Sequence, residues 1–125
     1  MAKKVSKNET NKLLKKVISS IEDKKGKNIV SIDLSKIDNA ITNYFVVCSA
    51  TSTTQVDAIY DNIMEKVYVD LNMKPFHREG YENSEWILID YFDLVVHIFL
   101  EDIRNFYKLE DLWADGIIKR YQNVD

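Results

Sequence analysis

Apolar residues recur along the chain at two different spacings, and the switches between them predict the order of helices and strands. The first stretch has the three-to-four-residue spacing of an amphipathic helix, with lysines on the other side, which we expect to face solvent. Basic residues followed by Gly26 predict its end, because cations stabilise the negative end of the helix dipole and glycine accepts a left-handed backbone. The predicted helix covers about residues 8–25. Its apolar stripe consists of Leu13, Leu14, Val17, Ile18 and Ile21.

Two strands and a second helix follow. Ile29–Leu34 predicts a strand, and the more apolar Tyr44–Ser49 predicts a strand in the middle of a sheet. Ser52 and Gln55 have the spacing of a capping box, in which the serine hydroxyl and the glutamine amide each satisfy a backbone N–H. They open an amphipathic run that ends before Pro75. The buried stripe of this predicted helix is Val56, Ile59, Tyr60, Ile63, Val67 and Leu71.

The second half of the chain predicts three more strands. They cover Phe76–Glu79, Trp86–Asp90 and Leu94–Leu100, with a polar turn region at residues 80–84. Glu101–Trp113 begins with two acids, which suit a helix N-terminus, and we expect one or two short helices there. This order predicts an α/β (α+β) fold in a single domain, with a sheet of about five strands and flanking helices.

Composition narrows the classes of function. The 125 residues are 46% hydrophobic, enough for the core of one domain, and a net charge of -3 gives no overall positive field for binding free nucleic acid. The longest apolar run, Leu94–Leu100, is far shorter than the ~20 residues of a membrane-spanning helix. Cys48 is the only cysteine and no secretory signal is visible, so we expect a cytoplasmic protein with a packed, unreactive thiol.

Alternation separates two faces of a hairpin formed by the last two predicted strands. One face is wholly aliphatic and is the natural core side: Ile87, Ile89, Leu94, Val96, Ile98 and Leu100. The other has too much apolar area to leave in water and carries like charges at its rim: Trp86, Leu88, Asp90, Asp93, Val95, His97 and Phe99. With Tyr91 and Phe92 in a two-residue turn, the predicted pairs are Asp90 with Asp93, Leu88 with Val95, and Trp86 with His97.

Two interpretations of this second face remain open on the pattern. Either helices cover it, as in any two-sided α/β sheet, or part of it is a docking surface for another protein. Aromatic residues beside acids are typical of interfaces in which Trp86 would be an anchor and rim charges would select a basic partner. Asp90 and Asp93 repel each other across the predicted turn, so a partner's lysine or arginine would relieve them.

Catalytic interpretations rest on weaker signals. Asp90, Asp93 and His97 are three potential metal ligands or acid–base groups, but aspartate is common in turns and a single histidine in an apolar strand is typical of a packed residue. The Ser/Thr-rich residues 49–54 suit either anion binding or helix capping. Because there is no glycine-rich phosphate loop and no His-Glu-x-x-His motif, and too few Cys and His for a zinc site, we expect no metal and no cofactor.

An ordered set of motifs from about Ile29 to Asp115 resembles the ribosomal silencing factor family, also called Iojap-like proteins. So ordered a set is specific, whereas the leading basic helix matches the family only in kind. The motifs are Asp33-Leu34, Ile41-Thr42-Asn43-Tyr44-Phe45-Val46-Val47, Thr51-Ser52-x-x-Gln55-Val56, Glu79-Gly80, Trp86-Ile87-Leu88-Ile89-Asp90-Tyr91-x-Asp93-x-Val95-Val96-His97-x-Phe99, and Arg104-x-Phe106-Tyr107-x-Leu109-Glu110-x-Leu112-Trp113.

The resemblance implies a mixed α/β domain similar to nucleotidyltransferases but without known catalysis, so we expect no enzyme. It implies a translation repressor that binds the large ribosomal subunit through ribosomal protein L14 and sterically blocks subunit joining, expected under nutrient limitation. Within the single domain, residues 1–26 would be an N-terminal amphipathic helix, 27–115 the family core and 116–125 a C-terminal tail. The family's partner-binding surface maps onto Trp86, Leu88, Asp90, Tyr91, Asp93 and His97, which favours the docking interpretation.

Other functions remain alternatives at this point. One is a metal-dependent nucleotidyl- or phosphoryl-transfer enzyme that uses Asp90, Asp93 and His97. Another is a scaffold for assembly of the large subunit, which would make the same contacts. Self-association of the Trp86 face into a homodimer is also expected when no ribosome is present.

Phe92 departs from the family pattern, which usually has Gly at this position of the turn, and often has Gly at Ala50 and Arg at Thr54. A tight hairpin turn needs a positive φ, which Phe resists, so a wider turn with a register shifted by a residue is the alternative. Phe92 then becomes a candidate extra contact to the partner.

Overall fold

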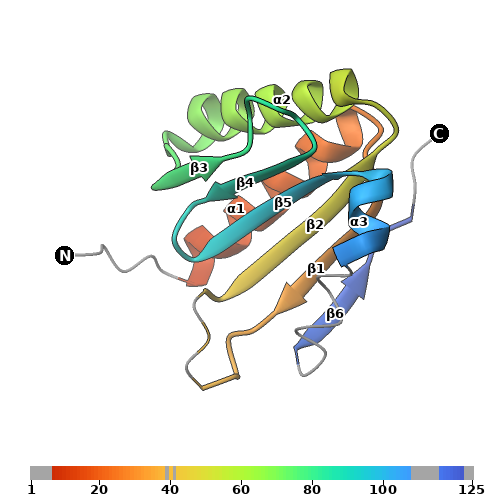
Figure 1. Cartoon of the computed structure of the whole chain (residues 1–125). Helices are drawn as coiled ribbons and strands as arrows, with labels where there is room; N and C mark the ends of the chain where they lie inside the picture. The colour runs from red at the N-terminus through yellow and green to blue at the C-terminus, as the bar shows by residue number, and fades with distance from the viewer. Residues whose placement is uncertain (1–6, 39, 41, 108–115, 123–125) are drawn as a thin grey trace.

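A six-stranded sheet with helices on both faces organises the chain (Figure 1). The computed structural model describes residues 7–38, 40, 42–107 and 116–122. The predicted mixed α/β fold is confirmed. In chain order the elements are α1 (Lys7–Asp23), β1 (Lys27–Asp33), β2 (Tyr44–Ala50), α2 (Thr53–Leu71), β3 (His77–Glu79), β4 (Trp86–Asp90), β5 (Leu94–Leu100), α3 (Glu101–Tyr107) and β6 (Ile117–Arg120).

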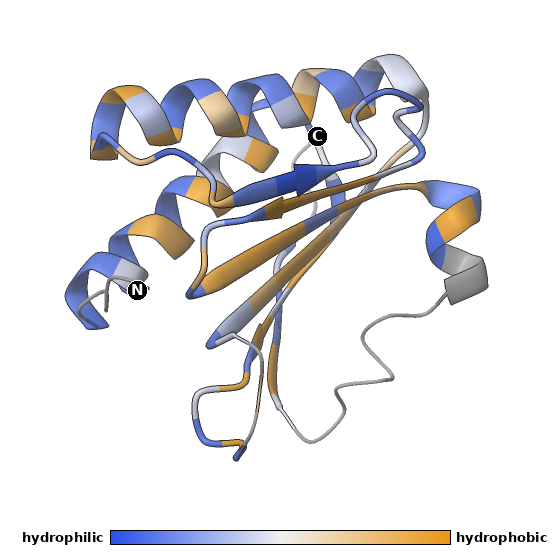
Figure 2. Cartoon of the chain, turned by 60° about the vertical axis from the view of Figure 1, so that its left-hand side comes forward, coloured by the Kyte–Doolittle hydropathy of each residue, from blue (hydrophilic) through white to orange (hydrophobic). Residues whose placement is uncertain are grey.

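The strands follow the order β3-β4-β5-β2-β1-β6 across the sheet. β2 and β5 are parallel neighbours in the middle, and all the other neighbouring pairs are antiparallel. Figure 1 and Figure 2 together show α1 and α2 on one side of the sheet and α3 on the other. The central position of β2 agrees with its apolar sequence, because a strand with neighbours and covering on both sides has no polar face.

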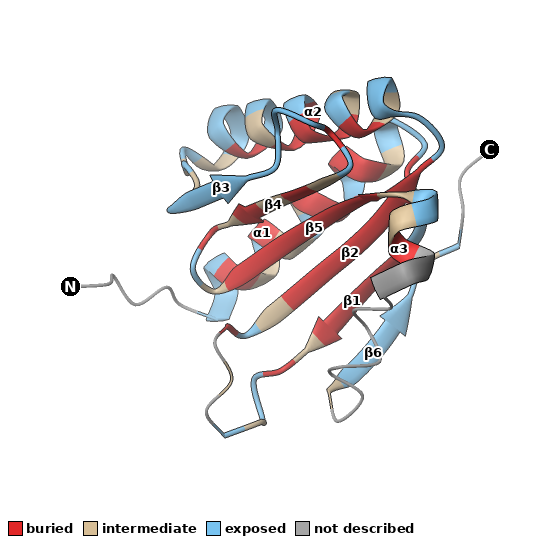
Figure 3. Ribbon diagram, viewed as in Figure 1, coloured by how far each residue is buried: buried red, intermediate tan, exposed pale blue. Residues whose placement is uncertain are grey.

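The core beneath α1 and α2 is built from the aliphatic positions that alternation predicted. Ile87, Ile89, Leu94, Val96 and Ile98 each have 0% of their surface exposed, which Figure 3 shows as the buried stretch along β4 and β5. Burying one such side chain contributes about 1.5–3 kcal/mol to folding. The helices complete this core with Leu13, Val17, Ile18, Ile21, Val56, Ile59, Ile63 and Val67.

The end of α1 corrects the predicted role of Gly26. The left-handed residue is Lys25, with φ 58°, while the N–H of Gly26 donates to the carbonyl of Ile21 at 3.0 Å. A Cβ on Gly26 would lie 2.3 Å from Cγ2 of Ile21 and 3.2 Å from Cδ1 of Ile59. Glycine is therefore needed here for close packing and not for its backbone freedom.

The start of α2 confirms the Ser52 part of the capping box. Oγ of Ser52 accepts the N–H of Gln55 at 3.1 Å, as an N-cap serine should. Oε1 of Gln55 accepts the N–H of Thr51 at 2.9 Å, and its Nε2 donates to the carbonyls of Lys24 and Lys25 at 3.1 and 3.0 Å. Gln55 thus ties the start of α2 to the loop after α1, and capping accounts for Ser52, whereas Oγ of Ser49 donates to the carbonyl of Lys27 at 3.2 Å.

β6 is an element that the sequence pattern did not predict, and it lies in the segment expected to be a tail. It pairs antiparallel with β1, Val30 opposite Arg120, and all four of its residues are exposed. The predicted C-terminal helix is present over Glu101–Tyr107, and the rest of that prediction, residues 108–113, lies outside the described residues. No helix within the described ranges is both long and apolar enough to span a bilayer.

Candidate protein-binding face

β4 and β5 form the predicted hairpin in a different register. Tyr91, Phe92 and Asp93 connect the strands, and the N–H of Tyr91 donates to the carbonyl of Leu94 at 2.9 Å, so the two-residue turn lies at Phe92 and Asp93, one residue later than predicted. The predicted pairs are wrong by two residues, and because this shift is even, every side chain stays on its predicted face. The observed pairs are Asp90 with Val95, Leu88 with His97, and Trp86 with Phe99.

Hydrogen bonds on both sides hold the tip of this hairpin. Phe92 has φ 79°, a left-handed conformation that is strained for a bulky residue. Oδ1 of Asp90 accepts the N–H of Phe92 at 2.7 Å, and Oγ1 of Thr42 donates to the carbonyl of Phe92 at 3.0 Å. Nδ2 of Asn43 donates to Oδ1 of Asp93 at 3.3 Å. The surrounding bonds thus impose the backbone conformation that the Phe92 side chain resists.

Trp86 is half-buried and fixed in place before any partner arrives. Its indole N–H donates to Nδ1 of His97 at 3.0 Å, and its ring stacks on Phe99 with centroids 4.8 Å apart. Burial lowers the pKa of His97 to about 4, so the ring is neutral at pH 7, and Nδ1 accepts because the proton is on Nε2. An aromatic ring ordered in this way loses little conformational entropy on binding.

The predicted site residues divide into an accessible set and a supporting set. Tyr91 and His97 are only 4% and 5% exposed, so we revise their expected role from contact to support. Tyr91 lies in the core beneath the helices, where its hydroxyl is 3.9 Å from Sδ of Met64, and burial raises its pKa. We call the accessible set the docking face: Trp86, Leu88, Asp90, Phe92 and Asp93.

The rest of the second face is buried, so the covered interpretation holds for that part, and docking stays a prediction for the accessible part. Arg104 of α3 donates to the carbonyl of Asn28 at 2.5 Å and to Oγ of Ser49 at 3.4 Å, which fixes α3 against this side of the sheet. Exposure remains along β4 and at the hairpin tip. A second buried cluster consists of Val30, Ile32, Leu34, Phe45 and Val95, with Leu88 packed at its margin.

Asp90, Asp93 and His97 are not brought together as a catalytic set. Nδ1 of His97 accepts from Trp86, Oδ1 of Asp90 accepts the N–H of Phe92, and Oδ1 of Asp93 accepts the side-chain amide of Asn43. Over the described ranges, no three His, Cys, Asp or Glu residues lie where they could hold a metal ion. Cys48 is fully buried, and this burial raises its pKa to about 12, so its thiol stays protonated.

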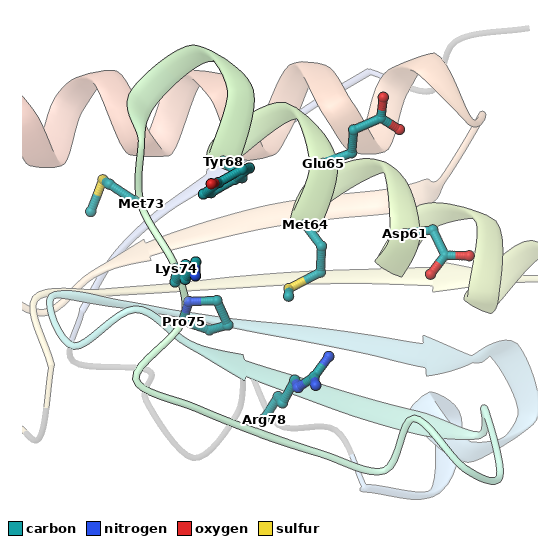
Figure 4. Close-up of a pocket in the computed structure, with 8 residues that line it drawn as sticks. All are labelled: Asp61, Met64, Glu65, Tyr68, Met73, Lys74, Pro75 and Arg78. Carbon is teal, nitrogen blue, oxygen red and sulfur yellow. The ribbon is translucent and has the colours of Figure 1, made fainter.

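A pocket of about 650 Å³ lies apart from the docking face, between α2 and the segment that leads into β3 (Figure 4). Its cations are already engaged: Nζ of Lys74 lies 5.5 Å from the ring centre of Tyr68, and Nη1 of Arg78 donates to the hydroxyl of Tyr60 at 2.5 Å. That hydrogen bond also raises the pKa of Arg78. The lining residues are Asp61, Met64, Glu65, Tyr68, Met73, Lys74, Pro75 and Arg78, none of them a predicted site residue.

Sequence reasoning missed three residues around the hairpin tip. Thr42 and Asn43 belong to a motif of the resemblance, and their signal was a pair of short polar residues directly before a buried strand. The third is Phe76, whose exposed ring packs edge-on against Phe92 with centroids 6.1 Å apart. No pattern in the sequence announced that contact, because it joins two loop residues that are far apart in the chain.

Comparison with known proteins decides the family. The family model described as "Ribosomal silencing factor during starvation" matches residues 7–125 of the chain. The chain belongs to the ribosomal silencing factor family. It is 36% identical over 104 residues to the ribosomal silencing factor RsfS of Halalkalibacterium halodurans, an alignment that covers 83% of this chain and 87% of that relative. The resemblance inferred from the motifs is therefore confirmed.

Two other similar proteins provide information on the fold and on the role of the family. A crystal structure of a Chromobacterium violaceum protein has a TM-score of 0.77 at 33% identity and covers 83% of this chain and 85% of that one. "Mitochondrial assembly of ribosomal large subunit protein 1" of Mus musculus is 34% identical over 76 residues, which are 58% of this chain and 33% of the mouse protein. Names of family members describe regulatory or assembly roles and not a catalysed reaction.

Proposed function

We propose that this ribosomal silencing factor binds the large ribosomal subunit through ribosomal protein L14 and blocks joining of the small subunit by steric exclusion, so that it represses translation. The observation that carries the proposal is the preordered Trp86 on a face rimmed by Asp90 and Asp93. A half-buried tryptophan is a typical interface anchor, and carboxylates at a rim select a basic partner such as a ribosomal protein. Family membership supports the ribosome as the target.

Light scattering of purified ribosomal subunits at increasing protein concentration tests this proposal. We expect wild-type protein to abolish joining and Trp86→Ala to need at least tenfold more protein, because loss of a buried tryptophan contact costs ~2 kcal/mol or more. Tyr68→Ala is the matched control, since Tyr68 is an aromatic residue on α2, 50% exposed and outside the docking face. A folded Trp86→Ala variant that blocks joining as well as wild type would show that Trp86 is not the anchor.

A role in assembly of the large subunit is the second candidate, favoured by the printed name of the mouse relative. The contacts to the large subunit would be the same, so binding alone does not separate the two roles. Undisturbed joining at a concentration that saturates the large subunit would support assembly and contradict silencing.

A homodimer in the absence of ribosomes is a further part of the proposal. Trp86 and Leu88 are partly exposed apolar side chains, and a second copy would cover them when no ribosome is present. Sedimentation of the free protein should then show a dimer. Trp86→Ala should weaken this dimer, and excess large subunit should dissociate it. A monomer at all concentrations would contradict this part.

A further inference from the structure

Phe76 and Phe92 are two exposed aromatic rings that contact each other beside the docking face. Phe76 is 76% exposed and Phe92 is 42% exposed, and neither belongs to a buried hydrophobic cluster. Their centroids are 6.1 Å apart with the ring planes at 77°, an edge-on arrangement. The core therefore gains little from either ring, and the fold does not explain why both are aromatic.

The same residue of the docking face positions both rings. The carbonyl of Asp90 accepts the N–H of Phe76 at 2.7 Å, and its Oδ1 accepts the N–H of Phe92 at 2.7 Å. Asp90 thus holds the backbone of both phenylalanines, one through its main-chain carbonyl and the other through its carboxylate. Phe76 directly precedes β3, an edge strand of the sheet, and Phe92 lies at the hairpin tip, so their contact links the docking face to this edge.

The backbone of Phe92 adds an independent argument. A bulky residue at φ 79° is strained, and this strain persists because Asp90 and Thr42 hold both the N–H and the carbonyl of Phe92. A side chain that is exposed yet strained lowers stability and gives the core nothing in return. Strain of this kind is typical of positions whose side chain serves binding.

We propose that Phe76 and Phe92 form an aromatic extension of the docking face that binds a lysine or arginine side chain of the basic protein partner. This rests on the proposed function for the identity of the partner. Aromatic faces attract cations, and the carboxylate of Asp90, which accepts the N–H of Phe92, strengthens that attraction. The chain's own nearby cations are engaged elsewhere: Lys74 over Tyr68, and Arg78 with Tyr60. Among the described residues, none supplies a cation to these two rings.

Affinity for the purified large ribosomal subunit, measured with matched variants, tests the extension. We expect Phe76→Ala and Phe92→Ala each to weaken binding about five- to tenfold. The double variant should lose less than the product of the two losses, because the rings act as a unit. Phe76→Leu keeps apolar area but loses the aromatic face, so it should bind nearly as weakly as Phe76→Ala. Leucine binding as well as phenylalanine would overturn the cation as occupant.

Phe92→Gly separates binding from a structural role. Glycine loses the ring as alanine does but accepts the positive φ, so we expect the same affinity loss as Phe92→Ala together with a melting temperature about 2 °C or more above that of Phe92→Ala. Val69→Ala, at a residue of α2 that is 69% exposed, is the control and should bind like wild type.

The outcomes also separate this extension from the proposed function. If Trp86→Ala loses affinity while the Phe76 and Phe92 variants bind like wild type, the docking face stands and the aromatic extension is wrong. If wild-type protein does not bind the large subunit at all, the proposed function fails and the extension fails with it.

Discussion

Neighbouring residues of β4 and β5 differ in burial, because they point to opposite sides of the sheet. On the side of α1 and α2, Ile87, Ile89 and Ile98 are fully buried among other aliphatic side chains. On the other side, Trp86 and Leu88 stay partly exposed, and Trp86 and Asp90 make specific polar bonds. Because alternate residues face the covered core and the proposed docking face, stability and binding should respond separately to mutation.

The largest effect on stability is expected from truncation in the covered core. Ile98→Ala should lower the free energy of unfolding by about 3 kcal/mol, because it removes buried methyl groups and leaves a cavity. Urea unfolding measures this loss. Leu88→Ala is the matched comparison on the partly exposed side and should cost clearly less. An equal loss of unfolding free energy in the two variants would show that the two faces do not differ in their contribution to stability.

A smaller effect should follow from acidification, and it comes from the side of the docking face. The pKa of His97 is about 4 in the folded protein and 6.5 in its ordinary state, so the unfolded chain binds more protons between these values. Stability from this group is therefore complete above about pH 6.5 and is lost as the pH falls toward 4. We expect a loss of about 2 kcal/mol between pH 7 and pH 5, measured by urea unfolding.

Two histidine variants identify the group responsible for that loss. His97→Gln should remove most of the pH dependence in this window, because no buried imidazole is left to titrate. His77→Gln, at an exposed residue paired with Glu79, should keep it. A pH dependence that survives in His97→Gln would assign the effect to another group.

The smallest effect is expected at the exposed start of α2. Ser52→Ala removes the cap on the N–H of Gln55 and should lower the free energy of unfolding by about 1 kcal/mol. Affinity for the large subunit should stay unchanged, since α2 lies on the opposite side of the sheet from the docking face. Thr54→Ala, two residues after the cap and equally exposed, is the control; a loss as large there would mean that the cap is not the cause.

Prediction from sequence succeeded where one period dominated a segment. Trp86–Asp90 and Leu94–Leu100 were predicted with the bounds that the structure has, because their aliphatic positions alternate without interruption. β6 was missed because Ile117–Arg120 shows no alternation and all its residues are exposed, so only pairing with β1 defines it. Whether a short edge segment forms a strand depends on the neighbouring strand as much as on its own residues.

The docking face was only partly predictable for a related reason. Alternation assigns Trp86 and Leu88 to one face and Tyr91, with Ile87 and Ile89, to the core face, but the resemblance that placed Tyr91 on the binding surface does not show this. Nor does it show that Thr42, from a distant loop, bonds to Phe92. Turn geometry depends on tertiary hydrogen bonds, and these have no local signal in the sequence.

The parallel pairing of β2 with β5 has a consequence for how the chain is made. α2, β3 and β4 lie between these strands in sequence, so β2 is synthesised well before its central partner exists. Until β5 emerges, the apolar edge of β2 has no strand to pair with, and such edges promote aggregation in partly folded chains. Yield of correctly folded protein should therefore depend on the time that elongation takes between the codons for Ala50 and Leu94, and on chaperones that cover the nascent chain during that interval.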